Sequence, residues 1–302
     1  MQKECLRPIF RNTLKGIVSP SPMRSRGGIV GCLLVLLYML ALPAHASDRC
    51  RFLSESSAAL PSTQTSPSYI VIGFLGGFVR HDEPHHPDVQ LIQDLRQEYP
   101  QQVYIALFEN CKVGVAYNTI LKLLGTRDGD APSDEKKCQA RIALFGHSWG
   151  ASAVVSLSRK LERAGIPVTL TIQVDSVAKP FQNDWLIPPN VREAANFYQT
   201  HGLIRGRRKI VPADPSHTTI LGNFLWEYNG EQAVCHGFSW RGRLLSKGHT
   251  QIECDHDVWL QVKALLRRHL LNPLITQTDV GQPFSPSRND RSGRTLSSEA
   301  VH

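Results

Sequence analysis

Apolar runs alternate with helical patterns along the middle of the chain. Near-continuous apolar runs predict buried strands at 69–75, 103–108, 142–145 and 168–174, with a weaker one at 194–199. Helical spacing predicts helices at 89–99, 113–124, 151–162 and 255–271. Strands that alternate with helices indicate βαβ units and a mostly parallel sheet. Because the strands are apolar throughout, we expect an α/β fold whose sheet is covered by helices on both faces.

The first 46 residues follow a different pattern, that of an N-terminal extension and a signal peptide. A basic segment with Arg24 and Arg26 precedes an apolar run at 29–42 and an A-x-A site at 44–46. An apolar run of this length is too short to span a bilayer comfortably. We therefore expect cleavage near Ala46, a secreted or periplasmic protein, and no stable membrane span in the mature form. Met23 would begin a signal peptide of ordinary length, so translation of residues 1–22 stays open.

Three further regions are predicted from composition and pattern. Residues 47–67 are rich in Ser, Thr and Pro and indicate a linker, and the polar residues 273–302 indicate a disordered tail. One α/β domain is expected over 68–272. There is little room before Tyr69 for two further strands, so we expect its sheet to be minimal at the N-terminal edge. Within it, 202–248 is predicted as an insertion or lid-like region. Its aromatic residues either line an acyl pocket or form the core of a small lid.

Charge and cysteine content exclude several classes of function. The net charge is +8 over 302 residues, but six basic residues against one acidic residue in the first 46 leave only +3 for the rest. No basic stripe with interleaved aromatic residues is present, which excludes a nucleic-acid partner. The chain has no C-x-x-C pair, which argues against structural zinc, and the His- and Asp-rich segment 81–88 favours a solvated loop over a metal site. We expect no metal and no cofactor.

The most informative segment is Gly146-His147-Ser148-Trp149-Gly150, which matches G-x-S-x-G. A predicted strand precedes it and a predicted helix follows it, as the nucleophile-elbow motif requires. In such an elbow the serine occupies a strained turn with its hydroxyl exposed at the top of a sheet. The backbone there lies so close to neighbouring elements that only glycine fits two residues before and two after. Ser148 is therefore the candidate nucleophile.

A serine nucleophile needs a general base, and the base needs a carboxylate that orients it. Asp175 directly follows the strand at 168–174, on the same rim as Ser148, and His249 lies in a predicted loop before the last helix. Asp214 is the alternative acid. The alternative bases are His201, His217, His236 and His256.

With the order Ser148, Asp175, His249, the chain resembles the α/β-hydrolase superfamily over about residues 68–271. The resemblance implies an oxyanion hole formed by two backbone N–H groups, one from Trp149 and one from the loop after the first strand. In that loop Leu75 stands where the family has histidine, so the second donor is Gly77 or Phe78. The alternative is a glycine turn with no catalytic task.

These expectations together predict a secreted serine hydrolase, esterase- or lipase-like, that acts on a small-molecule acyl substrate through an acyl-enzyme intermediate. Amidase and peptidase activity stay open, and so does the oligomeric state. The alternative from another class is a non-catalytic binding protein of the same fold. Export also favours disulfides. We expect Cys235 to pair with Cys254 around His249, with a Cys111–Cys138 pair or free thiols as alternatives.

Overall fold

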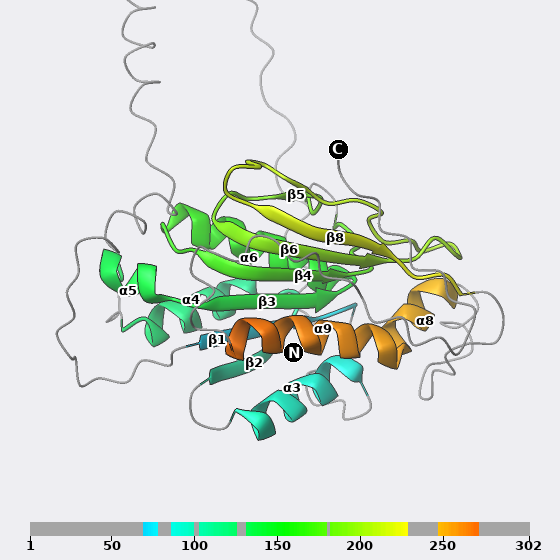
Figure 1. Ribbon diagram of the computed structural model, residues 1–302, viewed down its shortest axis with the longest axis horizontal. Coiled ribbons are helices and arrows are strands. Elements are labelled where there is room, and N and C mark those ends of the chain that lie inside the picture. Colours follow the sequence, from blue (N-terminus) through cyan, green and yellow to red (C-terminus); the bar gives the residue numbers. More distant parts are fainter. Residues whose placement is uncertain are drawn as a thin grey trace, which may run out of the picture. The chain divides into compact units, whose positions relative to one another are not determined.

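The sheet at the centre of the molecule is six-stranded and entirely parallel. The computed structural model describes residues 69–77, 86–99, 103–125, 131–179, 182–228 and 247–271. Strand order is β2-β1-β3-β4-β6-β8 (Figure 1). The strands are β1 (Tyr69–Leu75), β2 (Val103–Glu109), β3 (Ile142–His147), β4 (Val168–Val174), β6 (Val191–Tyr198) and β8 (Thr219–Leu225). Two short strands, β5 (Leu186–Ile187) and β7 (Val211–Pro212), pair separately.

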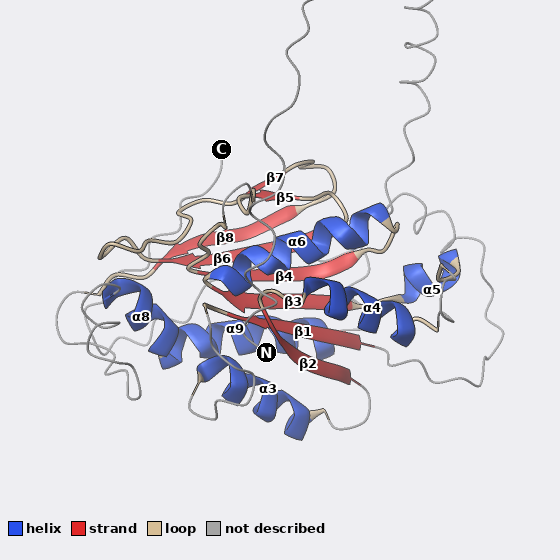
Figure 2. Cartoon of the chain, turned by 180° about the vertical axis from the view of Figure 1, so that it is seen from behind, coloured by secondary structure: helices blue, strands red, loops and turns tan. Residues whose placement is uncertain are grey.

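Helices cover both faces of this sheet. Helices α4 (Val113–Leu123) and α6 (Trp149–Arg163) lie on one face, and α3 (Pro87–Glu98) and α9 (His256–Leu271) lie on the other (Figure 2). The short helix α5 (Asp134–Gln139) precedes β3, and α8 (Lys247–Cys254) leads into α9. The predicted α/β architecture is thus confirmed. None of the helices in the described part of the chain has the length and apolar character that a membrane span needs.

Each strand contributes to two separate hydrophobic cores because its side chains alternate between the faces. In β1, Ile70 and Ile72 pack into the core beneath α4 and α6, whereas Val71 packs into the core beneath α3 and α9. In β3, Leu144 and Phe145 divide in the same way. All five side chains are at most 2% exposed. The unbroken apolar runs of the sequence therefore reflect burial on both sides of the sheet.

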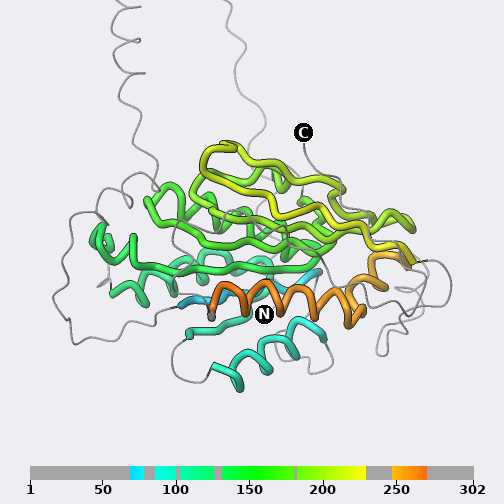
Figure 3. The backbone as a smooth tube through the Cα atoms, viewed as in Figure 1, coloured from blue at the N-terminus to red at the C-terminus, as the bar shows by residue number. Residues whose placement is uncertain are grey.

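The last helix returns to the beginning of the domain. Residues 247–271 cross the sheet and pass beside α3 (Figure 3). Lys263 Nζ lies 2.8 Å from carboxylate oxygens of both Asp94 and Glu98, and Arg267 Nε lies 2.9 Å from Glu98. Exposed ion pairs of this kind contribute little to the free energy of unfolding. Burial of apolar side chains of both helices in one core holds α9 in place.

The structure differs from the sequence prediction for residues 202–248. Thr219–Leu225 forms β8, the edge strand of the main sheet. Phe224, Trp226 and Tyr228 are buried in the core beneath α3 and α9, so they neither belong to a lid nor line a pocket. Helix α5 and the strand pair β5–β7 were not predicted. Several predictions fall on residues outside the described ranges. These are the predicted signal peptide, linker and C-terminal tail, Phe78, residues 81–85, and residues 229–246 with Cys235 and His236.

Candidate active site

Ser148 lies at a sharp turn between β3 and α6, with φ 56° and ψ −122°. Residues other than glycine rarely adopt such a backbone conformation. A Cβ atom on Gly146 would lie 2.5 Å from the carbonyl carbon of Gly150, and one on Gly150 would overlap the carbonyl oxygen of Phe74. Both glycines are therefore required by close packing, as the sequence motif predicts.

Three side chains from distant parts of the chain meet at this turn. His249 Nε2 lies 2.9 Å from Ser148 Oγ, and His249 Nδ1 lies 2.6 Å from Asp175 Oδ2. An ionised carboxylate only accepts hydrogen bonds, so Nδ1 carries the proton and Nε2 is left to accept one from the serine hydroxyl. The structure thus brings together the three residues that the sequence singled out, with spacings at which protons can be transferred.

Asp175 is held more tightly than its position after β4 requires. It is fully buried, and its φ of 44° makes it, with Ser148, one of the two non-glycine residues with positive φ in the described part of the chain. Its Oδ1 accepts hydrogen bonds from the backbone N–H groups of Gly206 and Gln199, at 2.9 and 3.3 Å. The side-chain amide of Gln199 donates to Oδ2 at 2.9 Å. Backbone strain of this kind persists only where the surroundings over-determine it.

The secondary structure at His249 differs from the prediction. It lies inside helix α8, not in a loop before the last helix. Gly248, which the sequence analysis took for a loop residue, is required by close approach, because a Cβ atom there would overlap the side chain of Gln199 and the carbonyl oxygen of His201. His249 is therefore fixed by a helix whose first turn packs against the segment that follows β6.

A second cluster of titratable residues lies behind the base. The rings of His147 and His249 are stacked, with centroids 4.7 Å apart. Glu253 Oε1 accepts a hydrogen bond from His86 Nε2 at 2.7 Å and lies 3.4 Å from His147 Nδ1. His86 Nδ1 in turn lies 3.5 Å from Asp88. All four members of this cluster, His86, Asp88, His147 and Glu253, are at most 5% exposed.

Burial and charge shift the pKa values of this cluster in different directions. Burial raises the pKa of Asp88 to about 6. Burial also disfavours the charge of Glu253, but the charges and hydrogen bonds of His147 and His86 outweigh it and lower the Glu253 pKa well below its usual range. Burial likewise opposes protonation of His86 and His147, but their carboxylate neighbours outweigh it and raise both pKa values. Burial and charge thus act in opposite directions on every member of the cluster.

The two candidate oxyanion donors lie at the start of α6 and in the loop after β1. Lys179 and Asn110 link these two segments. Trp149 is the first residue of α6, and Gly77 follows β1 with φ 43°. Asn110 Nδ2 donates to the carbonyl oxygen of Gly77 at 2.5 Å, and Lys179 Nζ donates to Asn110 Oδ1 at 2.5 Å. The same Lys179 nitrogen lies 5.5 Å from the centroid of the Trp149 ring. Burial lowers the pKa of Lys179. Phe78, the other candidate donor, lies outside the described residues.

The alternative acid and the alternative bases lie elsewhere. Asp214 precedes β8 and so lies at the amino end of the parallel sheet, opposite Ser148. It is paired with His217 at 2.8 Å. His201 and His256 are exposed, and His236 lies outside the described residues. No group of three or more His, Cys, Asp or Glu side chains within the described ranges has a metal-binding arrangement.

Four residues of the site were missed by the sequence analysis: Gln199, Glu253, Asn110 and Lys179. Each acts through a partner far away along the chain, such as the 167 positions between His86 and Glu253, so no local pattern marks it. His147 is the variable residue of the motif, and its stacking on His249 depends on the position of α8.

Comparisons with known proteins leave the function to the geometry. No protein-family model matches the chain, and no curated protein does. Among solved structures, the chain is similar to one described as RedJ with a PEG molecule bound in the active site. The identity is 13% and the TM-score 0.28, over 56% of this chain and 87% of RedJ. A likeness at this level says nothing about the activity of this chain.

Proposed function

We propose that the chain is a serine hydrolase of the α/β-hydrolase type that cleaves a carboxylic ester or a related acyl substrate. The observation that carries this proposal is the position of His249, which bridges Ser148 Oγ at 2.9 Å and Asp175 Oδ2 at 2.6 Å. The strained backbone at both Ser148 and Asp175 supports it further, because such strain clusters at active sites.

In the proposed reaction, Ser148 Oγ attacks the acyl carbon while His249 Nε2 takes the hydroxyl proton. Asp175 stabilises the imidazolium that forms, and Gln199 and Gly206 hold its carboxylate in place. His249 then gives the proton to the leaving alcohol, whose bond to the acyl carbon breaks, and the acyl group remains on Ser148. Water activated by His249 attacks this acyl-enzyme and releases the acid. All proton transfers use residues of this chain, and no cofactor or metal is part of the proposal.

The negative charge of each tetrahedral intermediate requires N–H donors at fixed points. We assign them to the backbone of Trp149 and to that of Gly77 or Phe78. The hydrogen bond from Asn110 to the Gly77 carbonyl supports this assignment, because it fixes the orientation of the loop after β1. Lys179 adds a positive charge 5.5 Å from the centroid of the Trp149 ring.

The second candidate function is a non-catalytic binding protein with this fold. A binding protein has no need for a histidine held between a serine and a buried carboxylate, so the observed geometry favours the enzyme. Labelling with a fluorophosphonate probe separates the two functions. An enzyme labels covalently at Ser148, and the label is lost in Ser148→Ala but kept in Ser156→Ala, a control on the same helix. Absence of labelling in the wild-type protein would favour the binding protein.

The substrate class can be approached with p-nitrophenyl esters of increasing acyl chain length, compared with the corresponding anilides. Faster turnover of esters is expected.

We also propose export to a secreted or periplasmic location, with cleavage of the signal peptide near Ala46. Mass spectrometry of the exported protein then finds Ser47 at the amino terminus, whereas retention of Leu33 to Leu42 would contradict cleavage.

A further inference from the structure

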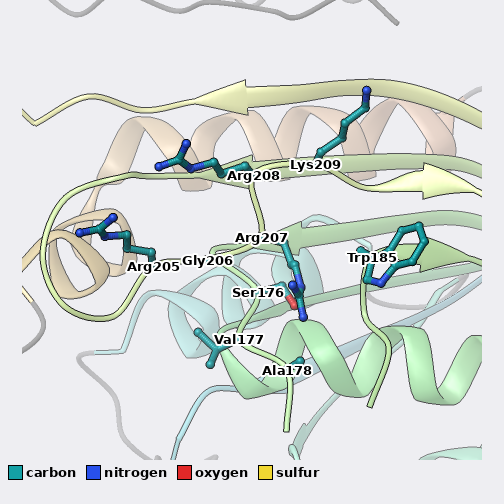
Figure 4. A pocket seen from close by; sticks show the side chains of 9 residues that line it. All are labelled: Ser176, Val177, Ala178, Trp185, Arg205, Gly206, Arg207, Arg208 and Lys209. Carbon is teal, nitrogen blue, oxygen red and sulfur yellow. The ribbon is translucent and has the colours of Figure 1, made fainter. Parts of the chain in front are cut away.

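A basic pocket lies next to the proposed active site. It has a volume of about 670 Å³ and lies between the segment that follows β4 and the loop that follows β6. Its walls include four cationic side chains, Arg205, Arg207, Arg208 and Lys209, together with Trp185. In Figure 4, Arg207 reaches toward Ser176, and Arg205, Arg208 and Lys209 are spread along the segment that forms the other wall. No acidic residue lines the pocket.

The positive charge of this pocket is only partly compensated. Arg207 Nε lies 2.6 Å from Oδ1 of Asp184, a carboxylate that is fully buried. Asp184 does not line the pocket, but it also accepts a hydrogen bond from the lining residue Ser176 at 2.6 Å. Within the described part of the chain, the Arg205 side chain donates to the carbonyl oxygen of Gly202 at 2.9 Å. Across the described ranges, no ion pair joins Arg205, Arg208 or Lys209 to an acidic residue. Three cations therefore remain available to a ligand.

The walls of the pocket are the segments that hold the proposed catalytic residues. Ser176 directly follows Asp175, and the Gly206 N–H donates to Asp175 Oδ1 at 2.9 Å. The Val177 N–H donates to the carbonyl oxygen of Ser148 at 3.2 Å. The pocket therefore shares its walls with the backbone segments that position Asp175 and Ser148.

We propose that this pocket binds an anionic group of the substrate, a carboxylate or a phosphate, and thereby selects acyl compounds that carry a negative charge. The inference rests on the proposed hydrolase function. Arginine side chains bind such groups with paired N–H donors, and unpaired cations raise the local concentration of anions. Trp185, 42% exposed, adds an aromatic side chain to the wall of the same pocket.

Two p-nitrophenyl esters test the proposal: the neutral butyrate and the glutarate half ester, which carries a terminal carboxylate. The variant is Arg208→Gln with Lys209→Gln, which removes two exposed charges. The matched control is Lys122→Gln with Arg192→Gln, which removes two exposed charges at the opposite end of the sheet. We expect the variant to lose about 10-fold in kcat/KM for the half ester, mainly through KM, and to hydrolyse the butyrate at the wild-type rate. The loss should diminish at high salt.

Equal losses for both esters, or the same loss in the control, would overturn the proposal. A binding measurement keeps it distinct from the proposed function. Calorimetry with the glutarate half ester and the Ser148→Ala protein should give binding that the Arg208 and Lys209 substitutions weaken about 10-fold, whether or not the wild-type protein turns over esters. Without such binding the proposal is wrong, even if ester hydrolysis is observed. Sedimentation with phosphatidylglycerol vesicles distinguishes a lipid headgroup from a soluble anion as the natural source of the charge.

Discussion

Gln199 donates a hydrogen bond from its side-chain amide to Oδ2 of Asp175, the same oxygen that accepts from His249. The other end of this amide is also fixed, because Gln199 Oε1 accepts from the backbone N–H of His201 at 2.6 Å. Gln199 is fully buried. It is therefore a positioning residue, which sets the orientation of the carboxylate that in turn orients the base.

We predict that Gln199→Ala lowers kcat for esters by roughly 10- to 100-fold with little change in KM, the effect expected for loss of a hydrogen bond to a charged group. Steady-state kinetics and thermal unfolding should be measured together. Gln139→Ala, on the exposed helix α5, is the control. An equal fall in kcat and in folded fraction would mean that Gln199 only stabilises the fold.

The strain at Ser148 has a measurable effect on stability. Glycine adopts positive φ at little cost, whereas a side chain there costs of order 1–3 kcal/mol. Ser148→Gly should therefore be more stable than Ser148→Ala by about 1 kcal/mol or more, although both lack the hydroxyl. Urea unfolding measures the difference. Ser156→Gly should instead be less stable than Ser156→Ala, because Ser156 lies inside α6. The same ranking at both positions would exclude strain at the elbow.

The identity of the acid can be tested with a pair of conservative substitutions. Asp175→Asn keeps the shape of the site but favours the wrong histidine tautomer, and a loss of about 10⁴-fold in kcat is expected. Asp214→Asn should leave kcat near the wild-type value, because Asp214 lies at the opposite end of the sheet. A large loss with Asp214→Asn and a small one with Asp175→Asn would reverse the assignment.

The buried cluster behind the base predicts an opposite pH dependence for its two carboxylates. The Asp88 pKa is about 6 in the folded protein, against 3.8 normally. Below pH 3.8 Asp88 is protonated in both the folded and the unfolded protein, so its titration does not affect stability. As pH rises toward 6, Asp88 ionises first in the unfolded protein, and the folded protein becomes less stable. The stability of Asp88→Asn relative to the wild-type protein should then rise by about 3 kcal/mol between pH 4 and 7.

Glu253 provides the opposite case. Because its pKa is lowered in the folded protein, its charge stabilises the fold above its usual value of 4.5, and that stabilisation is lost as pH falls. Glu253→Gln should thus be destabilised at neutral pH, and its deficit should shrink in acid. Urea unfolding of both variants from pH 4 to 7.5 checks the two trends. A constant difference from the wild-type protein at all pH values would contradict them.

The disulfides give a prediction about the segment around the base. Cys111, Cys138 and Cys254 are each disulfide-bonded. We predict that Cys254 pairs with Cys235, closing a loop that contributes roughly 3 kcal/mol. Non-reducing peptide mapping should find a linked Cys235–Cys254 peptide, and a different partner for Cys254 would refute this pairing.

The sequence predicted the fold where a segment is apolar on both faces, and failed where buried polar residues interrupt the pattern. Strand β8 contains Gly222 and Asn223. Asn223 is buried, and its Oδ1 accepts from Asn196 Nδ2 and from the backbone N–H of Ile210, at 3.2 and 2.7 Å. These hydrogen bonds make a polar residue acceptable inside the sheet, but they depend on partners that no local pattern reveals.

The same reasoning explains which parts of the site were predictable. Ser148 has a local signature because its glycines are needed within five residues of sequence. Asp175 is positioned by a strand end, which the pattern also gives. Helix α8 was read as a loop because Gly248 resembles a turn residue, whereas its contact with Gln199 requires glycine for space. Gln199 and Glu253 act only through the folded arrangement.

The contact between Gly150 and β1 has a consequence for protein engineering. The first turn of α6 touches the carbonyl oxygens of Phe74 and Leu75, so the strand that leads to Gly77 also seats the helix that begins with Trp149. The same contact therefore positions both Ser148 and the loop after β1, and the two segments form one structural unit. A graft into another parallel sheet would have to move residues 69–77 and 142–163 together, since either segment alone would lose its template.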